Sequence, residues 1–113
     1  MLISKELLGS VTGRFIGTLK EIENGILYYT YKECLGGCEI HGRINLCELM
    51  CEIKHWALDR DCTIMSFIDF DGTAFANVFC LLNHTKVSFQ GNLEYEAVFK
   101  AGEIVLMESV NVK

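Results

Sequence analysis

One stretch of the chain carries apolar residues with the spacing of an α-helix, and this stretch constrains the fold more than any other feature. Between residues 44 and 60 the apolar side chains recur every three or four positions, which aligns them along one side of a helix. The apolar positions are Leu46, Leu49, Met50, Ile53 and Ala57, and the polar side carries Glu48, Glu52, His55 and Asp59. Asn45 supplies an N-cap side chain directly before the stretch. We therefore expect one long helix that buries a single side.

The remainder of the chain reads as strands joined by tight turns. The dipeptides Asn24-Gly25 and Asp71-Gly72 each separate two strand-like runs, and both accept the positive φ values of a two-residue hairpin. Residues 86 to 100 alternate apolar and polar side chains, with a bend at Gly91, and residues 103 to 112 supply a last strand. The sequence shows no internal repeat.

These elements predict an α+β fold in which a single long helix packs on a curved antiparallel sheet of about six strands, in the order β-β-α-β-β-β-β. The chain has 113 residues, of which 50% are hydrophobic. That is enough apolar material for one core and too little length for two. We expect a single domain that spans residues 1 to 113.

Charge and hydropathy exclude several classes of protein. The net charge is -5, which disfavours a basic face that binds nucleic acid. The apolar stretches are strand-sized and interrupted, so no membrane-spanning segment is expected. The first residues do not combine a basic, an apolar and a small-residue region as a secretory signal does. We expect a cytoplasmic protein that associates with neither nucleic acid nor membrane.

The chain contains six cysteines, and we expect them to be reduced thiols that behave as small apolar side chains. A zinc site is the alternative, because thiolates and imidazoles together bind zinc. Its ligands would come from Cys34, Cys38, Cys47 and Cys51 with His41 and His55. The cysteine pairs have three intervening residues instead of the two of a zinc knuckle. We therefore expect no metal and no cofactor.

Three short motifs stand in order along the chain. Residues 13 to 17 read Gly-Arg-Phe-Ile-Gly, residues 21 to 25 read Glu-Ile-Glu-Asn-Gly, and residues 40 to 42 read Ile-His-Gly before the helix. This order resembles the hotdog-fold acyl-thioester superfamily of thioesterases and dehydratases, in which a first hairpin, a His-Gly loop, a central helix and a four-stranded meander follow one another. The resemblance implies a hotdog-like domain that forms a homodimer.

The resemblance also implies a site for an acyl-coenzyme A or acyl-carrier-protein thioester at the start of the helix. The backbone N–H groups there favour negative charge and would polarise the thioester carbonyl. A carboxylate on the helix would activate water, and a loop histidine would orient the substrate. The catalytic residues would be Glu52, Glu48 and His41, and the substrate-binding residues would be Gly42, Arg43 and Trp56. The protein would then be a thioester hydrolase or an acyl-thioester binding protein.

A second class of function stays open, namely a non-catalytic binding or assembly protein that acts through a protein interface. In that interpretation the two glutamates belong to a solvated helix face, His41 satisfies a turn carbonyl and Arg43 is a surface residue. An unrelated cystatin-like or nuclear-transport-factor-like cone would also place a helix on a curved sheet. A void beside Glu52 and His41 would favour the enzyme, because a structural module fills that space with side chains.

Overall fold

The structure is a computed structural model that describes residues 3 to 81 and 85 to 111. The described elements follow the chain in the order α1 (Lys5–Thr12), β1 (Phe15–Glu23), β2 (Ile26–Lys32), β3 (Ile40–Asn45), α2 (Leu46–Leu58), β4 (Cys62–Ile68), β5 (Ala74–Cys80), β6 (Thr85–Gly91) and α3 (Glu94–Asn111). The strands form two separate antiparallel sheets, with the orders β1-β2-β3 and β4-β5-β6.

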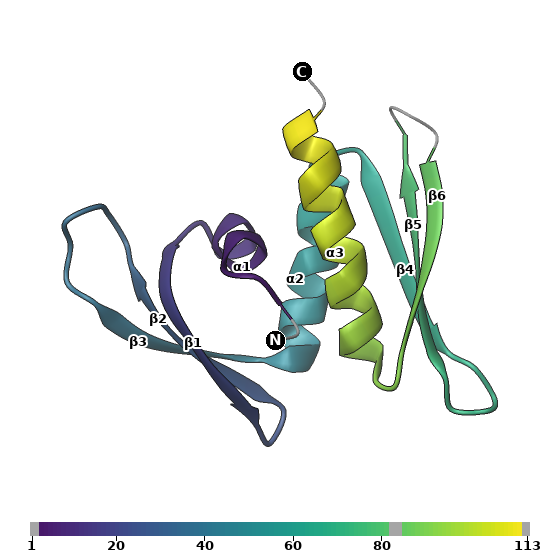
Figure 1. Ribbon diagram of the computed structural model, residues 1–113, viewed down its shortest axis with the longest axis horizontal. Coiled ribbons are helices and arrows are strands. Elements are labelled where there is room, and N and C mark those ends of the chain that lie inside the picture. The colour runs from purple at the N-terminus through teal and green to yellow at the C-terminus, as the bar shows by residue number, and fades with distance from the viewer. Residues whose placement is uncertain (1–2, 82–84, 112–113) are drawn as a thin grey trace.

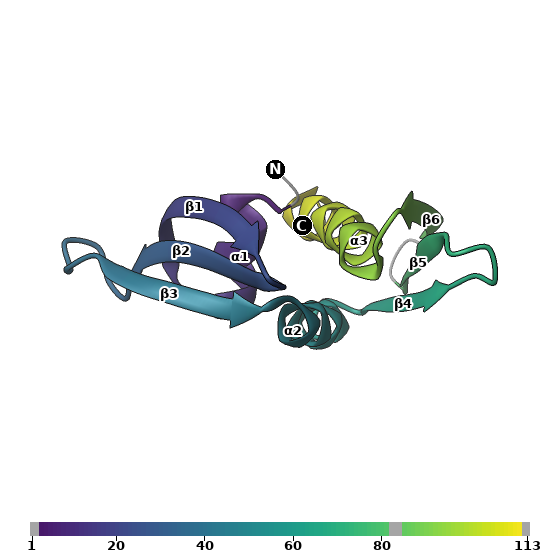
Figure 2. The same cartoon turned by 90° about the horizontal axis from the view of Figure 1, so that it is seen from below.

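The two sheets flank a central pair of helices. In Figure 1, α2 and α3 run side by side between the sheets, and α1 packs on the first sheet. The molecule is a thin slab with extents of 42 × 38 × 19 Å. Figure 2 shows β3, α2 and β4 along one broad side of this slab, with α3 toward the opposite side. Among the described residues, no helix has both the length and the apolar character that crossing a membrane requires.

The core lies where the helices meet each other and the inner sides of the sheets. Its largest fully buried side chains are Phe99, Leu7, Leu8, Leu27, Leu49, Ile53, Val78, Val98 and Val105. They come from all three helices and from both sheets. The two sheets are therefore joined through the helices and not edge to edge.

The same arrangement occurs twice along the chain. A three-stranded antiparallel meander leads into α2, and a second meander leads into α3. Asn24-Gly25 and Asp71-Gly72 turn the first hairpin of each unit, and Asn45-Leu46 and Asn92-Leu93 stand at the two helix starts. The repeat is therefore one of topology.

The expected hairpins and the expected helix are confirmed. Asn24 and Gly25 have φ values of 54° and 76°, as the two-residue turn requires. The helix α2 begins after Asn45, whose Oδ1 accepts hydrogen bonds from the N–H groups of Cys47 and Glu48 at 2.8 and 3.4 Å. The turn around Asp71-Gly72 joins β4 to β5 as predicted, but it is not the expected two-residue turn: β4 ends at Ile68, β5 begins at Ala74, and of the two residues only Gly72 has a positive φ, 88°.

The α+β class is confirmed, but the finer architecture differs from the prediction. The expected single curved sheet of about six strands is two sheets of three strands, and there are three helices among the described residues. The strand expected at residues 86 to 100 ends at Gly91, and residues 94 to 100 together with the expected last strand at 103 to 112 form the helix α3, although residue 112 itself lies outside the described part. Ala97, Val98 and Phe99 are all fully buried in this helix. A helix covered on several sides lacks the one-sided stripe by which an amphipathic helix is recognised.

Two further elements were not expected. The helix α1 is capped by Ser4, whose hydroxyl accepts from the N–H of Leu7, and it ends at Gly13 in the left-handed conformation. The His-Gly loop expected at residues 40 to 42 is part of the strand β3, which pairs with β2 along its whole length. Pairing with β2 is a tertiary contact, and it turns the segment before α2 into a strand.

Candidate functional site

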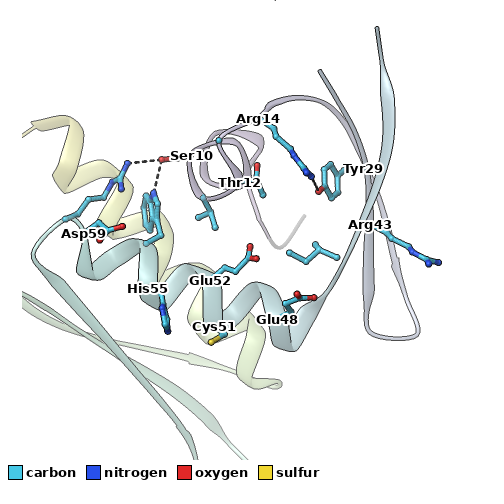
Figure 3. A pocket seen from close by; sticks show the side chains of 15 residues that line it. Ser10, Thr12, Arg14, Tyr29, Arg43, Glu48, Cys51, Glu52, His55 and Asp59 are labelled. Atoms are coloured by element: carbon cyan, nitrogen blue, oxygen red, sulfur yellow. Dashed lines mark hydrogen bonds between the residues drawn. The ribbon is translucent and has the colours of Figure 1, made fainter. Parts of the chain in front are cut away.

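A cleft of about 950 Å³ lies between α1, the first sheet and α2 (Figure 3). Its lining residues come from four segments of the chain: Ser10, Val11, Thr12, Gly13 and Arg14; Tyr29; Arg43 and Ile44; and Glu48, Cys51, Glu52, His55, Trp56, Asp59 and Arg60. The cleft therefore exists because the first sheet and α1 lean over one side of α2.

One wall of the cleft is held by a hydroxyl that joins α1 to the end of α2. The side chain of Ser10 accepts hydrogen bonds from Trp56 Nε1 at 2.9 Å and from Arg60 Nη2 at 3.1 Å. The guanidinium of Arg60 also lies 4.3 Å from the centre of the Trp56 ring, a favourable cation–π arrangement. This wall combines a nearly buried aromatic ring with a fixed positive charge.

A second arginine is fixed on the opposite wall. Arg14 Nη1 donates a hydrogen bond to the Tyr29 hydroxyl at 2.9 Å, and its guanidinium lies 4.1 Å from the centre of the Tyr31 ring. Both arginines are therefore oriented by an aromatic ring and a hydroxyl. The cleft presents two positive groups whose positions do not depend on a ligand.

The carboxylates come from α2 and face these positive groups. In Figure 3 the side chains of Glu48 and Glu52 rise from α2 toward α1, whereas Cys51 and His55 point away from it. Glu48, Glu52 and Asp59 balance Arg14, Arg43 and Arg60 in the lining. The cleft can thus bind a polar ligand that carries both signs of charge, or it can form part of a contact with another protein.

The structure brings four of the predicted site residues to this cleft and leaves two outside it. Arg43, Glu48, Glu52 and Trp56 line it, although the Arg43 side chain extends away from α2 in Figure 3. His41 is an exposed residue of β3 opposite Thr30 and does not line the cleft. The void that we named as a mark of an enzyme lies beside Glu52, and His41 is not among the residues that line it.

Gly42 has a packing role in β3. It pairs with Tyr29, and a Cβ at this position would lie 2.8 Å from the Tyr29 ring and 3.0 Å from the Tyr31 ring. Real Cβ atoms essentially never approach so closely. The glycine lets the two tyrosine rings cover the strand, which explains it without a bound substrate.

The backbone N–H groups at the start of α2 already have protein partners. Leu46 N donates to the Gly25 carbonyl at 2.9 Å, and the next two N–H groups donate to Asn45 Oδ1. An oxyanion site needs donors that are aimed at the substrate oxygen. A thioester carbonyl at this helix start would have to compete with these bonds.

The cysteines divide into two groups. Cys62 and Cys80 are buried, as we expected, whereas Cys34, Cys38, Cys47 and Cys51 are exposed, which corrects the prediction for those four. Cys47 and Cys51 lie on the side of α2 opposite its buried stripe. Within the described residues, no group of three or more His, Cys, Asp or Glu side chains is placed to hold a metal ion.

The outer side of the second sheet carries exposed apolar side chains. Met65, Phe67 and Phe79 are 63%, 46% and 44% exposed. Phe67 stacks on its cross-strand neighbour Phe75 at a centroid distance of 5.3 Å. The sequence did indicate this surface: β4 has apolar residues at successive positions, so the strand is apolar on both sides and needs a cover on each.

The residues of the cleft that the sequence reading missed belong to α1 and its surroundings, chiefly Ser10, Arg14 and Tyr29. The helix signals for α1 were Ser4 and Gly13, an N-cap and a left-handed C-cap. Comparisons of the chain with family models, with curated proteins and with solved structures each returned no match.

Proposed function

We propose that this protein is a non-catalytic binding or assembly protein that acts through protein interfaces, and that it does so as a homodimer. The observation that carries the proposal is the uncovered side of α2, which lies between two free sheet edges on one broad side of the slab (Figure 2). Measuring the oligomeric state of variants with substitutions on this side of α2 tests the proposal.

The uncovered side of α2 carries residue types that are usually buried. Cys47, Cys51 and Leu58 are exposed there, Leu58 by 57%. Cysteine and leucine are among the residue types most often buried. Their spacing of four and seven positions along α2 is that of a helix seam, so a second helix would cover all three at once.

The neighbouring sheet edges favour a partner on the same side. β3 and β4 are edge strands of their sheets, and both lie beside α2 in Figure 2. Edge strands in natural proteins are usually covered, charged or paired. A second copy placed on this side would cover both edges and α2 in one contact.

The chain exposes more surface than a compact monomer of its size. It exposes 6943 Å², whereas a compact monomer of its 12.8 kDa mass exposes about 6300 Å². Its radius of gyration is 14.4 Å, compared with about 13 Å for a compact domain of this length. The excess surface is what a two-fold contact between slabs would bury.

The charges on α2 favour a second copy over a different helix. Its first half carries Glu48 and Glu52, and its second half carries Lys54 and His55. In an antiparallel pair that crosses at Cys51, the acidic first half of each α2 lies along the basic second half of the other. A two-fold axis through Cys51 makes this contact twice.

Sedimentation equilibrium of the wild type is expected to give twice the chain mass of 12.8 kDa. Leu58→Asp should shift the protein to the monomer, because it places a charge in the seam without touching a buried residue. Leu35→Asp is the matched control, since Leu35 is 81% exposed in the loop between β2 and β3. A thiol crosslinker should join two chains through Cys51. A wild-type mass that stays at one chain on concentration contradicts the homodimer.

Thioester hydrolysis or thioester binding is the second candidate, and the cleft beside Glu52 is the observation that favours it. An acyl-coenzyme A or an acyl-carrier-protein thioester would place its acyl chain along Trp56, with Glu52 or Glu48 as the base. Thiol release from short, medium and aromatic acyl-coenzyme A should then fall about 10²-fold in Glu52→Gln. No release by the wild type, together with no rise in melting temperature, rejects both the enzyme and the acyl-binding protein.

The expected cytoplasmic location belongs to the same proposal. Its support is that Cys34, Cys38, Cys47 and Cys51 are exposed free thiols in the structure, which is typical of a reducing compartment.

A further inference from the structure

Two of the cysteines meet inside the second sheet. Cys62 is the first residue of β4 and Cys80 is the last residue of β5, and the two are register partners. Their Sγ atoms lie 2.8 Å apart, and both residues are buried, with 5% and 3% exposure. They are 18 positions apart in sequence, so their contact depends on the hairpin.

The hydrogen-bond pattern of the hairpin fixes the kind of pair that they form. Leu81 N donates to the Asp61 carbonyl at 2.9 Å, and Asp69 N donates to the Thr73 carbonyl at 2.8 Å. Hydrogen-bonded and non-hydrogen-bonded pairs alternate along an antiparallel ladder. The pair next to Asp61 and Leu81, which is Cys62 with Cys80, is therefore non-hydrogen-bonded.

This position suits a disulfide. The Cα atoms of a non-hydrogen-bonded pair are about 4.5 Å apart, and their side chains lean together. Disulfides span Cα distances of about 4.4 to 6.8 Å. The backbone of β4 and β5 can therefore accept a covalent bond between these two residues without moving.

We propose that Cys62 and Cys80 are a dithiol–disulfide pair that is oxidised by a small disulfide such as oxidised glutathione. One thiolate attacks the small disulfide, forms a mixed disulfide and releases one glutathione thiolate. The second thiolate attacks the protein sulfur of that mixed disulfide and releases the other. Two protein thiols and one oxidised glutathione thus give one protein disulfide and two reduced glutathiones, which take up the two protons.

Burial decides when the reaction takes place. It raises the pKa of the Cys62 thiol to about 12, helped by the hydrogen bond with Cys80, and a thiol is not nucleophilic until it ionises. Exchange therefore needs the hairpin to open, during folding or a local fluctuation. Once closed, the sheet and α3 shield the bond from reductants. The disulfide would close the β4–β5 hairpin at the end opposite its turn.

The test is to unfold the reduced wild type, refold it in a mixture of reduced and oxidised glutathione, and count free thiols under denaturing conditions. We expect the count to fall from the six of the reduced chain to four, with the link mapped to Cys62 and Cys80 by peptide mass. The oxidised protein should melt at a higher temperature than the reduced one. Protein that is folded before the oxidant is added should react much more slowly.

Two variants separate this pair from the other thiols. Replacement of Cys34, Cys38, Cys47 and Cys51 by serine should leave the internal link unchanged, because all four are exposed. Cys80→Ala should give only a glutathione adduct on Cys62. The proposal is overturned if Cys62 and Cys80 remain alkylatable after refolding, or if Cys62 links preferentially to one of the exposed cysteines.

Discussion

The indole nitrogen of Trp56 donates a hydrogen bond to the side-chain oxygen of Ser10 across 2.9 Å. The two residues are 46 positions apart, and the bond joins α1 to α2 at the wall of the cleft. Trp56 is 7% exposed, so its N–H has little access to water. The hydrogen bond to Ser10 therefore holds this wall of the cleft in place, because the Trp56 N–H has little water to bond with instead.

Ser10→Ala is expected to lower the free energy of unfolding by about 1 to 2 kcal/mol, because it leaves the N–H of Trp56 without its acceptor. Chemical denaturation measures the loss, and the Trp56 fluorescence should change with it. Ser88→Ala is the matched control, since Ser88 makes an exposed hydrogen bond with Asn77 and should lose less than about 0.5 kcal/mol. Equal losses in the two variants would show that the Ser10 hydrogen bond contributes no more stability than an exposed one.

The cap of α2 makes a second prediction. Asn45→Ala removes the acceptor of two helix N–H groups and should cost about 1 kcal/mol of stability. Asn45→Asp should retain most of it, because a carboxylate accepts the same bonds and complements the helix dipole. Melting temperatures of the three proteins measure the difference. A loss in the Asp variant as large as in the Ala variant would argue against capping.

Local signals predicted the elements that local interactions form. Asn24-Gly25 supplies both positive φ values of its hairpin, and Asn45 satisfies the first N–H groups of α2. Because the helix was placed correctly, Glu48 and Glu52 reach the cleft that the site prediction required. Sequence therefore suffices where the deciding contacts lie within a few residues.

Tertiary contacts decided the elements that the sequence did not reveal. The alternation of residues 87 to 99 continues through Gly91, but α3 packs against two other helices and a sheet, so its apolar residues surround it. A local sign of the helix did exist, since Leu93 N donates to Glu96 Oε1 at 3.1 Å. His41 lies outside the cleft because its segment pairs with β2 and forms a strand.

Gly42→Ala provides a test of why glycine stands in β3. The new Cβ would meet the Tyr29 ring at 2.8 Å, and this overpacking should cost about 1 to 3 kcal/mol. Urea denaturation measures it. His41→Ala, at the exposed neighbouring position, should stay within about 0.5 kcal/mol of the wild type. If the glycine served substrate access instead, Gly42→Ala would leave stability unchanged and alter only ligand binding.

The buried thiol of Cys62 makes the stability of the reduced protein depend on alkaline pH. Burial raises its pKa from 9.0 to about 12, with smaller contributions from the hydrogen bond and charge of Cys80 and from the charges of Glu108 and Asp61. Below pH 9 the folded and unfolded chains both carry the proton, so the contribution to stability is complete. Between pH 9 and 12 the unfolded chain releases the proton and the folded chain retains it.

The free energy of unfolding should therefore fall as the pH rises above 9, by up to about 1.4 kcal/mol per pH unit for this proton. Lysines and tyrosines titrate in the same range, so the measured quantity is the difference between the wild type and Cys62→Ala, both kept reduced. This difference should shrink with rising pH, because the alanine variant has no thiol to ionise while its packing loss stays constant. Urea denaturation at about pH 8, 9 and 10 gives the three points, and parallel profiles would contradict the raised pKa.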